Sequence, residues 1–229
     1  MTSEQSSLAA SIAVAARSIQ SSHSLDETLQ AIADAARASV PGIDHAGIST
    51  ITRAGEISTR AATDRLVNDL DDLQYRIMEG PCLDALREYR VVEAPNIRHD
   101  QRWPNYVVEA VPCGLRAQLA IRLFLDKAGT LGGLNLYSTE ADELDPDATN
   151  IADLFAAHAS IALGHAQETA QLNEALHSRK VIGQALGILM ERYEMHEDRA
   201  FAFLTRASSH GNIKLRDVAQ ELVDQVNSR

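Results

Sequence analysis

The residues of this chain best suited to bind another molecule lie within the last fifty or so of its 229 positions. Arg179 and Lys180 can contact phosphate groups, and the Gln184 amide can hydrogen-bond the edge of a nucleobase. Gly183 and Gly187 are four residues apart and would share one face of a helix, where each glycine costs about 1 kcal/mol. Because glycine destabilises a helix, two glycines on one face indicate that something comes close to the helix backbone there, either a second helix or a nucleic-acid backbone.

Further candidates for the same surface follow along the chain. Tyr193 could stack on an unpaired base, or it could seal the end of a helix. Arg192, Lys214 and Arg216 add positive charge, although most such side chains only solvate a protein surface. The predicted nucleic-acid contacts are Arg179, Lys180, Gln184, Ala185, Gly187, Arg192, Tyr193, Lys214 and Arg216.

The charge of the chain restricts how nucleic acid could bind. The net charge is −11, which argues against wholesale coating of a polyanion. Residues 1–165 hold 13 Lys+Arg and 23 Asp+Glu, whereas residues 177–216 hold 7 basic and 4 acidic side chains. We therefore expect an acidic body joined to a locally basic head, whose binding would be local and sensitive to salt.

Several other classes of function find no support. The sequence holds no nucleophile–base constellation, P-loop or paired-carboxylate motif in a suitable context, so we expect no catalytic residues. Cys82 and Cys113 lack a metal-type spacing, and we expect no metal site. No apolar stretch approaches the ~20 residues that cross a bilayer, and the N-terminus lacks the basic segment of a secretory signal. The expectation is a cytoplasmic protein with reduced thiols.

The elements that must position these residues follow an α+β order. Helical spacing is present over residues 5–20, and Ser24 and Glu27 form a capping box that opens a helix to about residue 39. Asp64 is placed to cap another helix. The remaining predictions are strands over 45–52, 56–62, 91–94, 117–125 and 131–138, and helices from 81 and over 104–111.

A single long helix is predicted over residues 147–193, because this stretch has no proline and its apolar residues recur every three or four positions. Ile182, Leu189 and Met190 are expected in a core. The part near 158–176 has weaker apolar positions, yet a parallel homodimer through this helix is expected because the stripe must be buried. We place a sensor-like domain at 1–163 and a three-helix head at 164–229.

Two resemblances give these domains an interpretation. The run Ile182-Gly-Gln-Ala-Leu-Gly-Ile-Leu-Met190, with the two segments after it, resembles the ANTAR family of RNA-binding antiterminators over about 166–227. Leu186 stands where that family commonly has lysine. Three segments resemble GAF domains of actinobacterial type over about 24–163, namely Glu79-Gly-Pro-Cys-Leu-Asp-Ala-Leu86, 100–104 and 131–138. That resemblance implies a six-stranded antiparallel sheet flanked by helices, with a ligand cavity on one face.

The resemblances imply a signal-responsive regulator whose head binds stem-loops in nascent RNA as a dimer and prevents a terminator hairpin from forming. A stiff helix leaving the sensor would carry the signal. Cys82, Asp84, Trp103 and Tyr106 are candidates to line the ligand cavity, with ordinary packing as the alternative; the sequence does not indicate the ligand or any other cofactor. Two alternatives stay open, namely a DNA-binding regulator and a ligand or redox sensor whose head binds protein.

Overall fold

The computed structural model describes residues 24–52, 54–126 and 129–228, so the helix expected over residues 5–20 lies outside the described part. The α+β order is confirmed. Among the described residues, no helix is at once long enough and apolar enough to cross a bilayer. The elements are α2 (Leu25–Ser39), β1 (His45–Ile51), β2 (Ile57–Ala62), α3 (Arg65–Ile77), α4 (Pro81–Arg87), β3 (Val91–Ala94), the 3-10 turn Ile97–His99, α5 (Pro104–Ala110), the 3-10 turn Val111–Cys113, β4 (Ala117–Leu125), β5 (Gly129–Ser138), α6 (Ala148–Tyr193), α7 (Glu197–Gly211) and α8 (Leu215–Asn227).

Local side chains start the helices where the sequence predicts. The Ser24 hydroxyl accepts a hydrogen bond from the Glu27 amide, and the Glu27 carboxylate accepts one from the Ser24 amide, so the capping box at α2 is complete. The Asp64 carboxylate accepts hydrogen bonds from the amides of Leu66 and Val67 at the start of α3. Proline occupies the first position of both α4 and α5, where its missing N–H is not needed.

The strands form one antiparallel sheet in the order β2-β1-β5-β4-β3. The described residues contain five strands rather than the six that the resemblance implies, so that expectation is corrected. β1 and β5 pair at the centre, with Ser49 opposite Gly133 and Thr50 opposite Gly132. A side chain at Gly132 would collide with the backbone of Ser49, so glycine is what allows these two strands to come this close.

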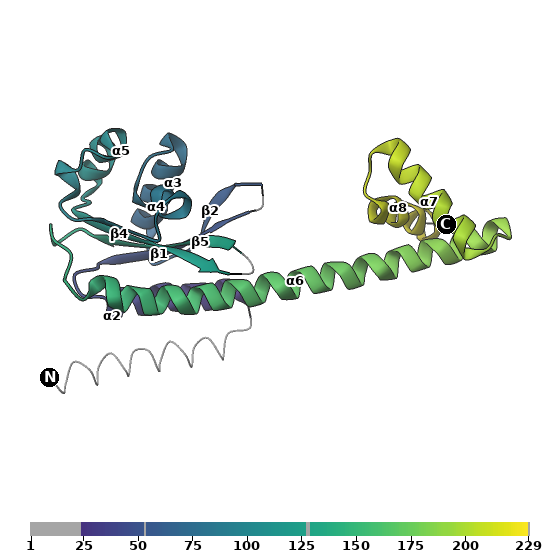
Figure 1. Ribbon diagram of the computed structural model, residues 1–229, viewed down its shortest axis with the longest axis horizontal. Coiled ribbons are helices and arrows are strands. Elements are labelled where there is room, and N and C mark those ends of the chain that lie inside the picture. The colour runs from purple at the N-terminus through teal and green to yellow at the C-terminus, as the bar shows by residue number, and fades with distance from the viewer. Residues whose placement is uncertain (1–23, 53, 127–128, 229) are drawn as a thin grey trace, which may run out of the picture. The chain divides into compact units, whose positions relative to one another are not determined.

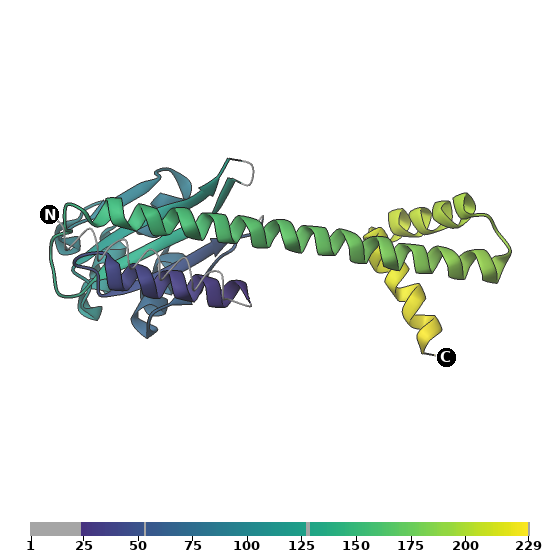
Figure 2. The same cartoon turned by 90° about the horizontal axis from the view of Figure 1, so that it is seen from below.

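Each face of the sheet carries its own core. Leu134 and Leu136 of β5 point to the face covered by α2 and the first part of α6, which contribute Leu29 and Phe155. Tyr137 points to the opposite face, which α3, α4 and α5 cover. Figures 1 and 2 show α2 beside the N-terminal part of α6 on one face and α3, α4 and α5 on the other.

The chain divides into two compact units, Met1–Ala166 and Gln167–Arg229. In the second unit, which we call the head, the last part of α6 packs against α7 and α8. Asn212 ends α7 in the left-handed conformation, with φ 48°, and turns the chain into α8. The buried core of the head is Val181, Ala185, Leu189, Ala200, Leu204, Ala219 and Val223.

Candidate nucleic-acid interface and sensor core

One face of α6 in the head points away from the core. It carries most of the residues of this helix that the sequence predicts to contact nucleic acid. Lys180, Gln184 and Gly187 follow one another at helical spacing, and all three are exposed. Arg179 is exposed beside them. We call these four residues together with Gly183 the outward face of α6. This face offers two cations and an amide around a strip of bare backbone, which is the chemistry that phosphates and base edges need.

The two glycines of the outward face have no packing role within the chain. An added Cβ at Gly183 or Gly187 would meet no described atom within 4 Å. The alternative that these glycines let a neighbouring helix of the same chain pack closely is therefore not supported. Without side chains, these two positions leave the helix backbone open to close approach from outside the chain.

The sequence interpretation was wrong for two apolar positions. Ala185 was predicted to contact nucleic acid, but it is fully buried in the head core, so a ligand at the surface cannot reach it. Met190 was predicted in the core, yet it is exposed, because helical spacing turns it about 100° from Leu189, which is buried. Leu186, where the resemblance leads one to expect lysine, is partly buried and packs against the same core.

The remaining predicted contacts differ in how free they are. Arg192 and Lys214 are exposed, and Tyr193 at the end of α6 is 58% exposed. Arg216 is engaged within the head, since its guanidinium donates to the carboxylates of Glu174 and Asp217, and the pairing with these two carboxylates raises its pKa. Arg216 is thus partly neutralised, whereas Lys214 remains available to a phosphate.

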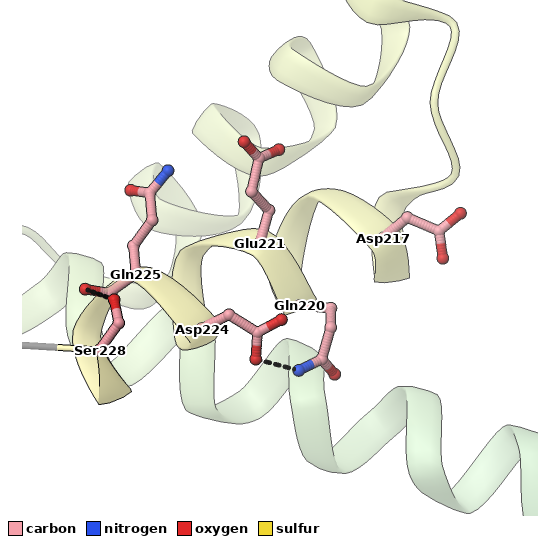
Figure 3. Close-up of a pocket in the computed structure, with 6 residues that line it drawn as sticks. All are labelled: Asp217, Gln220, Glu221, Asp224, Gln225 and Ser228. Atoms are coloured by element: carbon pink, nitrogen blue, oxygen red, sulfur yellow. Dashed lines mark hydrogen bonds between the residues drawn. The ribbon is translucent and has the colours of Figure 1, made fainter.

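The outer face of α8 is unsuited to a polyanion. A shallow hollow of about 560 Å³ lies over it, and Figure 3 shows Asp217, Glu221 and Asp224 spread along this helix. Gln220 Nε2 donates a hydrogen bond to Asp224 Oδ1 at 2.7 Å. Three carboxylates share this helix face, and although Asp217 is paired with Arg216, the surface is unfavourable for phosphate groups.

The residues predicted to line a ligand cavity all lie on the α4–α5 side of the sheet, where they are packed. The Trp103 indole donates from Nε1 to Asp84 Oδ2 at 2.8 Å, and the Tyr106 hydroxyl donates to Gln118 Oε1 at 2.8 Å. Cys82, Trp103 and Tyr106 are buried. The structure therefore brings these residues to one side of the sheet and gives each aromatic ring a polar partner.

Cys82 lies buried in the first turn of α4, where its thiol favours the neutral form. Burial, and next the charge of Asp71, raise the pKa of Cys82 to about 12. Asn135 Nδ2 donates to its sulfur at 3.2 Å, and Ser49 Oγ lies 3.5 Å away. A neutral, hydrogen-bonded thiol is unreactive at neutral pH, which argues against a redox role.

A buried polar cluster that the sequence interpretation missed surrounds Asp71 of α3. Asp71 accepts hydrogen bonds from the Tyr137 hydroxyl, from Thr59 Oγ1 at 2.7 Å and from Asn135 Nδ2 at 3.1 Å. Burial raises its pKa to about 6, although these hydrogen bonds oppose the shift. In the described part of the chain, Asn135 Oδ1 and Gln118 Nε2 are buried without a hydrogen-bond partner. The signal in the sequence was Asn135, a polar residue between two leucines of a strand.

Comparisons with known proteins agree with this division of the chain. A GAF domain model matches residues 22–164, and an ANTAR domain model matches residues 170–223. No curated protein is detectably similar in sequence.

Solved structures share the fold of the N-terminal unit. The GAF domain from Acinetobacter phosphoenolpyruvate-protein phosphotransferase is 13% identical, with a TM-score of 0.55 over 72% of this chain and 97% of that one. The GAF domain of a phosphoenolpyruvate-protein phosphotransferase from Coxiella burnetii is 12% identical, with a TM-score of 0.57 over 72% and 96%. The photosensory core module of the Stigmatella aurantiaca phytochrome is 12% identical, with a TM-score of 0.57 over 86% and 43%. Likeness at this level of identity shows the fold alone.

Proposed function

Because this chain belongs to the GAF domain family and carries an ANTAR domain after its GAF domain, we propose that it regulates transcription by binding stem-loop RNA and preventing termination in response to a signal. GAF domains sense signals and ANTAR domains bind RNA, so a chain with both is a signal-responsive regulator. The finer steps, namely antitermination, the stem-loop target and the dimer, are the proposal.

The observation that carries the proposal is the outward face of α6. Arg179, Lys180 and Gln184 are exposed there beside two glycines whose open space nothing else in the described chain fills. The ion pairs that the described residues of the head form are those of Arg216 with Glu174 and Asp217, so the two cations of this face remain free for phosphate. Lys214, Arg192 and Tyr193 extend the proposed contact surface.

We further propose a homodimer through α6. In the N-terminal unit this helix exposes Leu154 and Ile161, and in the head it exposes Leu172 and Leu176. Large aliphatic side chains on one helix favour a second helix as their cover. Light scattering should give twice the chain mass of 24.9 kDa, and Leu172→Glu with Leu176→Glu should return the monomer. A monomeric wild-type protein at high micromolar concentration, with and without RNA, would contradict the dimer.

The signal is proposed to reach the head from a ligand held on the α4–α5 side of the sheet. Cys82, Asp84, Trp103 and Tyr106 are the proposed surroundings of that ligand, together with the cluster around Asp71. Helix α6 supplies Phe155 to the core of the sensor and Val181 to the core of the head. A change of packing in the sensor therefore has a continuous helix along which to act.

The rival DNA-binding function is disfavoured by charge. A recognition helix enters the major groove of DNA between two rows of phosphates. The outer face of α8 carries Asp217, Glu221 and Asp224, which would be repelled there.

The experiment that tests the proposed function compares RNA with DNA on the full chain. A pool of RNAs with two stem-loops and randomised loops is offered together with duplex DNA of matched length, at about 0.05 and 0.2 M salt. We expect the chain to enrich RNA and to bind it more weakly at the higher salt concentration. Equal binding of duplex DNA, or no enrichment of RNA, would refute the proposal.

A further inference from the structure

Helix α7 carries a basic and aromatic stripe that lies outside the set of predicted contacts. Arg199, Phe203, Arg206 and His210 are spaced by four, three and four residues, so they share one face of the helix. All four are exposed, and the exposed fraction of Phe203 is 53%. We call these residues the α7 stripe. An exposed phenylalanine between two cations is suited to an occupant that is both flat and anionic.

The same helix provides a contrast that shows what is special about Phe203. Phe201 is 47% exposed, but it lies two residues earlier and hence about 200° around the helix. Its neighbours at the preceding turn are Glu197 and Asp198, whereas Phe203 has Arg199 before it and Arg206 after it. Two phenylalanines of similar exposure therefore lie in surroundings of opposite charge, and only the one in the α7 stripe is complementary to a polyanion.

The cations of the stripe are not neutralised by their own head. Among the described residues of the head, the ion pairs are those of Arg216, and neither Arg199 nor Arg206 takes part in one. His210 Nδ1 lies 3.1 Å from the carbonyl oxygen of Arg206, so the imidazole is held at the end of the stripe. Free guanidinium groups on each side of a ring can pair with phosphates while the ring offers its face.

We propose that an unpaired base of an RNA loop stacks on Phe203 while phosphates next to that base pair with Arg199 and Arg206. The inference rests on the proposed function and adds a second contact surface to the outward face of α6. Proteins read single-stranded RNA by stacking splayed-out bases on aromatic side chains and guanidinium planes. The spacing supports this, since Arg199 and Arg206 are about one helical turn from Phe203 on either side.

The test uses the full chain and the stem-loop RNA that the wild-type protein enriches from a pool with randomised loops. Phe203→Leu should weaken binding by about 5- to 150-fold, the loss expected when one base–aromatic stack is removed. Phe201→Leu is the matched control and should change binding by less than about twofold, because surface changes away from a site have small effects. Phe203→Tyr keeps the ring and should restore binding to near the wild-type value.

A measurement on unmodified protein separates stacking from a structural effect. Each loop nucleotide is replaced in turn by an abasic residue. One replacement should cost wild-type protein as much as Phe203→Leu costs, and that cost should vanish in the Phe203→Leu variant. Arg206→Ala should lower the slope of log K against log salt by about 0.7, whereas Phe203→Leu should leave that slope unchanged.

The outcomes distinguish this site from the proposed function. If no RNA is enriched, both fail. If RNA binds and depends on Arg179 and Lys180 but not on Phe203, the α7 site is refuted and the RNA-binding function stands. Equal losses for Phe201→Leu and Phe203→Leu would also overturn the site. A change of molecular mass in Phe203→Leu without any abasic position of matching cost would show that the α7 stripe binds a second copy of the chain instead.

Discussion

Replacing Gly183 and Gly187 by alanine should make the head more stable and its RNA binding weaker. Both residues lie inside α6, and an added Cβ at either would meet no described atom within 4 Å. Neither has the positive φ that would strain an alanine. The folded chain therefore offers no steric objection to the substitution, and any cost must come from a bound partner.

The two effects can be estimated separately. Alanine is favoured over glycine inside a helix by about 0.8–1.0 kcal/mol, so the free energy of unfolding should rise by roughly 2 kcal/mol for the pair. On the outward face, two methyl groups would hold a ligand away from the backbone. Overfilling a closely packed contact costs about 1–3 kcal/mol, which corresponds to a loss of roughly 5- to 150-fold in affinity.

Urea denaturation measures the first effect and RNA titration the second, on the same samples. Gln225→Ala, on the outer face of α8, is the control, because it also raises helix propensity but should leave RNA binding unchanged. A pair of alanines that stabilises the head without weakening RNA binding would show that the outward face of α6 is not approached closely. A destabilised double variant would mean that the space beside the glycines is filled within the protein.

Three further results are expected. Arg179→Ala with Lys180→Ala should weaken RNA binding and lower the salt slope by about 1.4, with no change in stability, because both side chains are exposed; unchanged affinity at about 0.15 M salt would remove them from the site. Leu186→Lys should tighten RNA binding and raise the slope by about 0.7, while lost packing lowers stability by about 1 kcal/mol; lower stability alone would show that lysine finds no phosphate there. The pKa of the Asp71 carboxyl is raised from 3.8 to about 6, so the native state binds this proton more tightly than the unfolded state does. The resulting stabilisation of the native state is present below about pH 4 and is lost as the pH rises through 6. Asp71→Asn should therefore exceed wild type by up to ~3 kcal/mol near pH 8 and differ little near pH 4 in calorimetry, and parallel pH profiles would refute this.

The elements of the fold could be read from local chemistry, but their arrangement could not. The caps at Ser24 and Asp64 and the prolines at α4 and α5 act within one turn of chain, so the sequence predicted those boundaries. The sheet order is a different matter, because pairing of β1 with β5 depends on contacts between residues far apart in sequence.

The exposure of the candidate side chains could be predicted where they are charged, but not where packing decides which side of a helix is buried. Arg179 and Lys180 were expected at the surface and lie there. Ala185 is small enough to be compatible with either side of a helix, and only the positions of α7 and α8 bury it. The buried state of Asp71 was not predicted from the sequence, because it depends on Tyr137 and Asn135 from a strand more than sixty residues away.

The acidic outer face of α8 has a kinetic consequence. The carboxylates on the outer face of α8 and the free guanidinium groups of the α7 stripe form two surfaces of opposite charge on the head, although its net charge is small. A hairpin that diffuses toward the head would be turned away from one helix and drawn toward the other, so fewer encounters would be wasted in the wrong orientation. Neutralising Asp217, Glu221 and Asp224 would then leave the dissociation rate of RNA almost unchanged while making its capture less selective for one orientation.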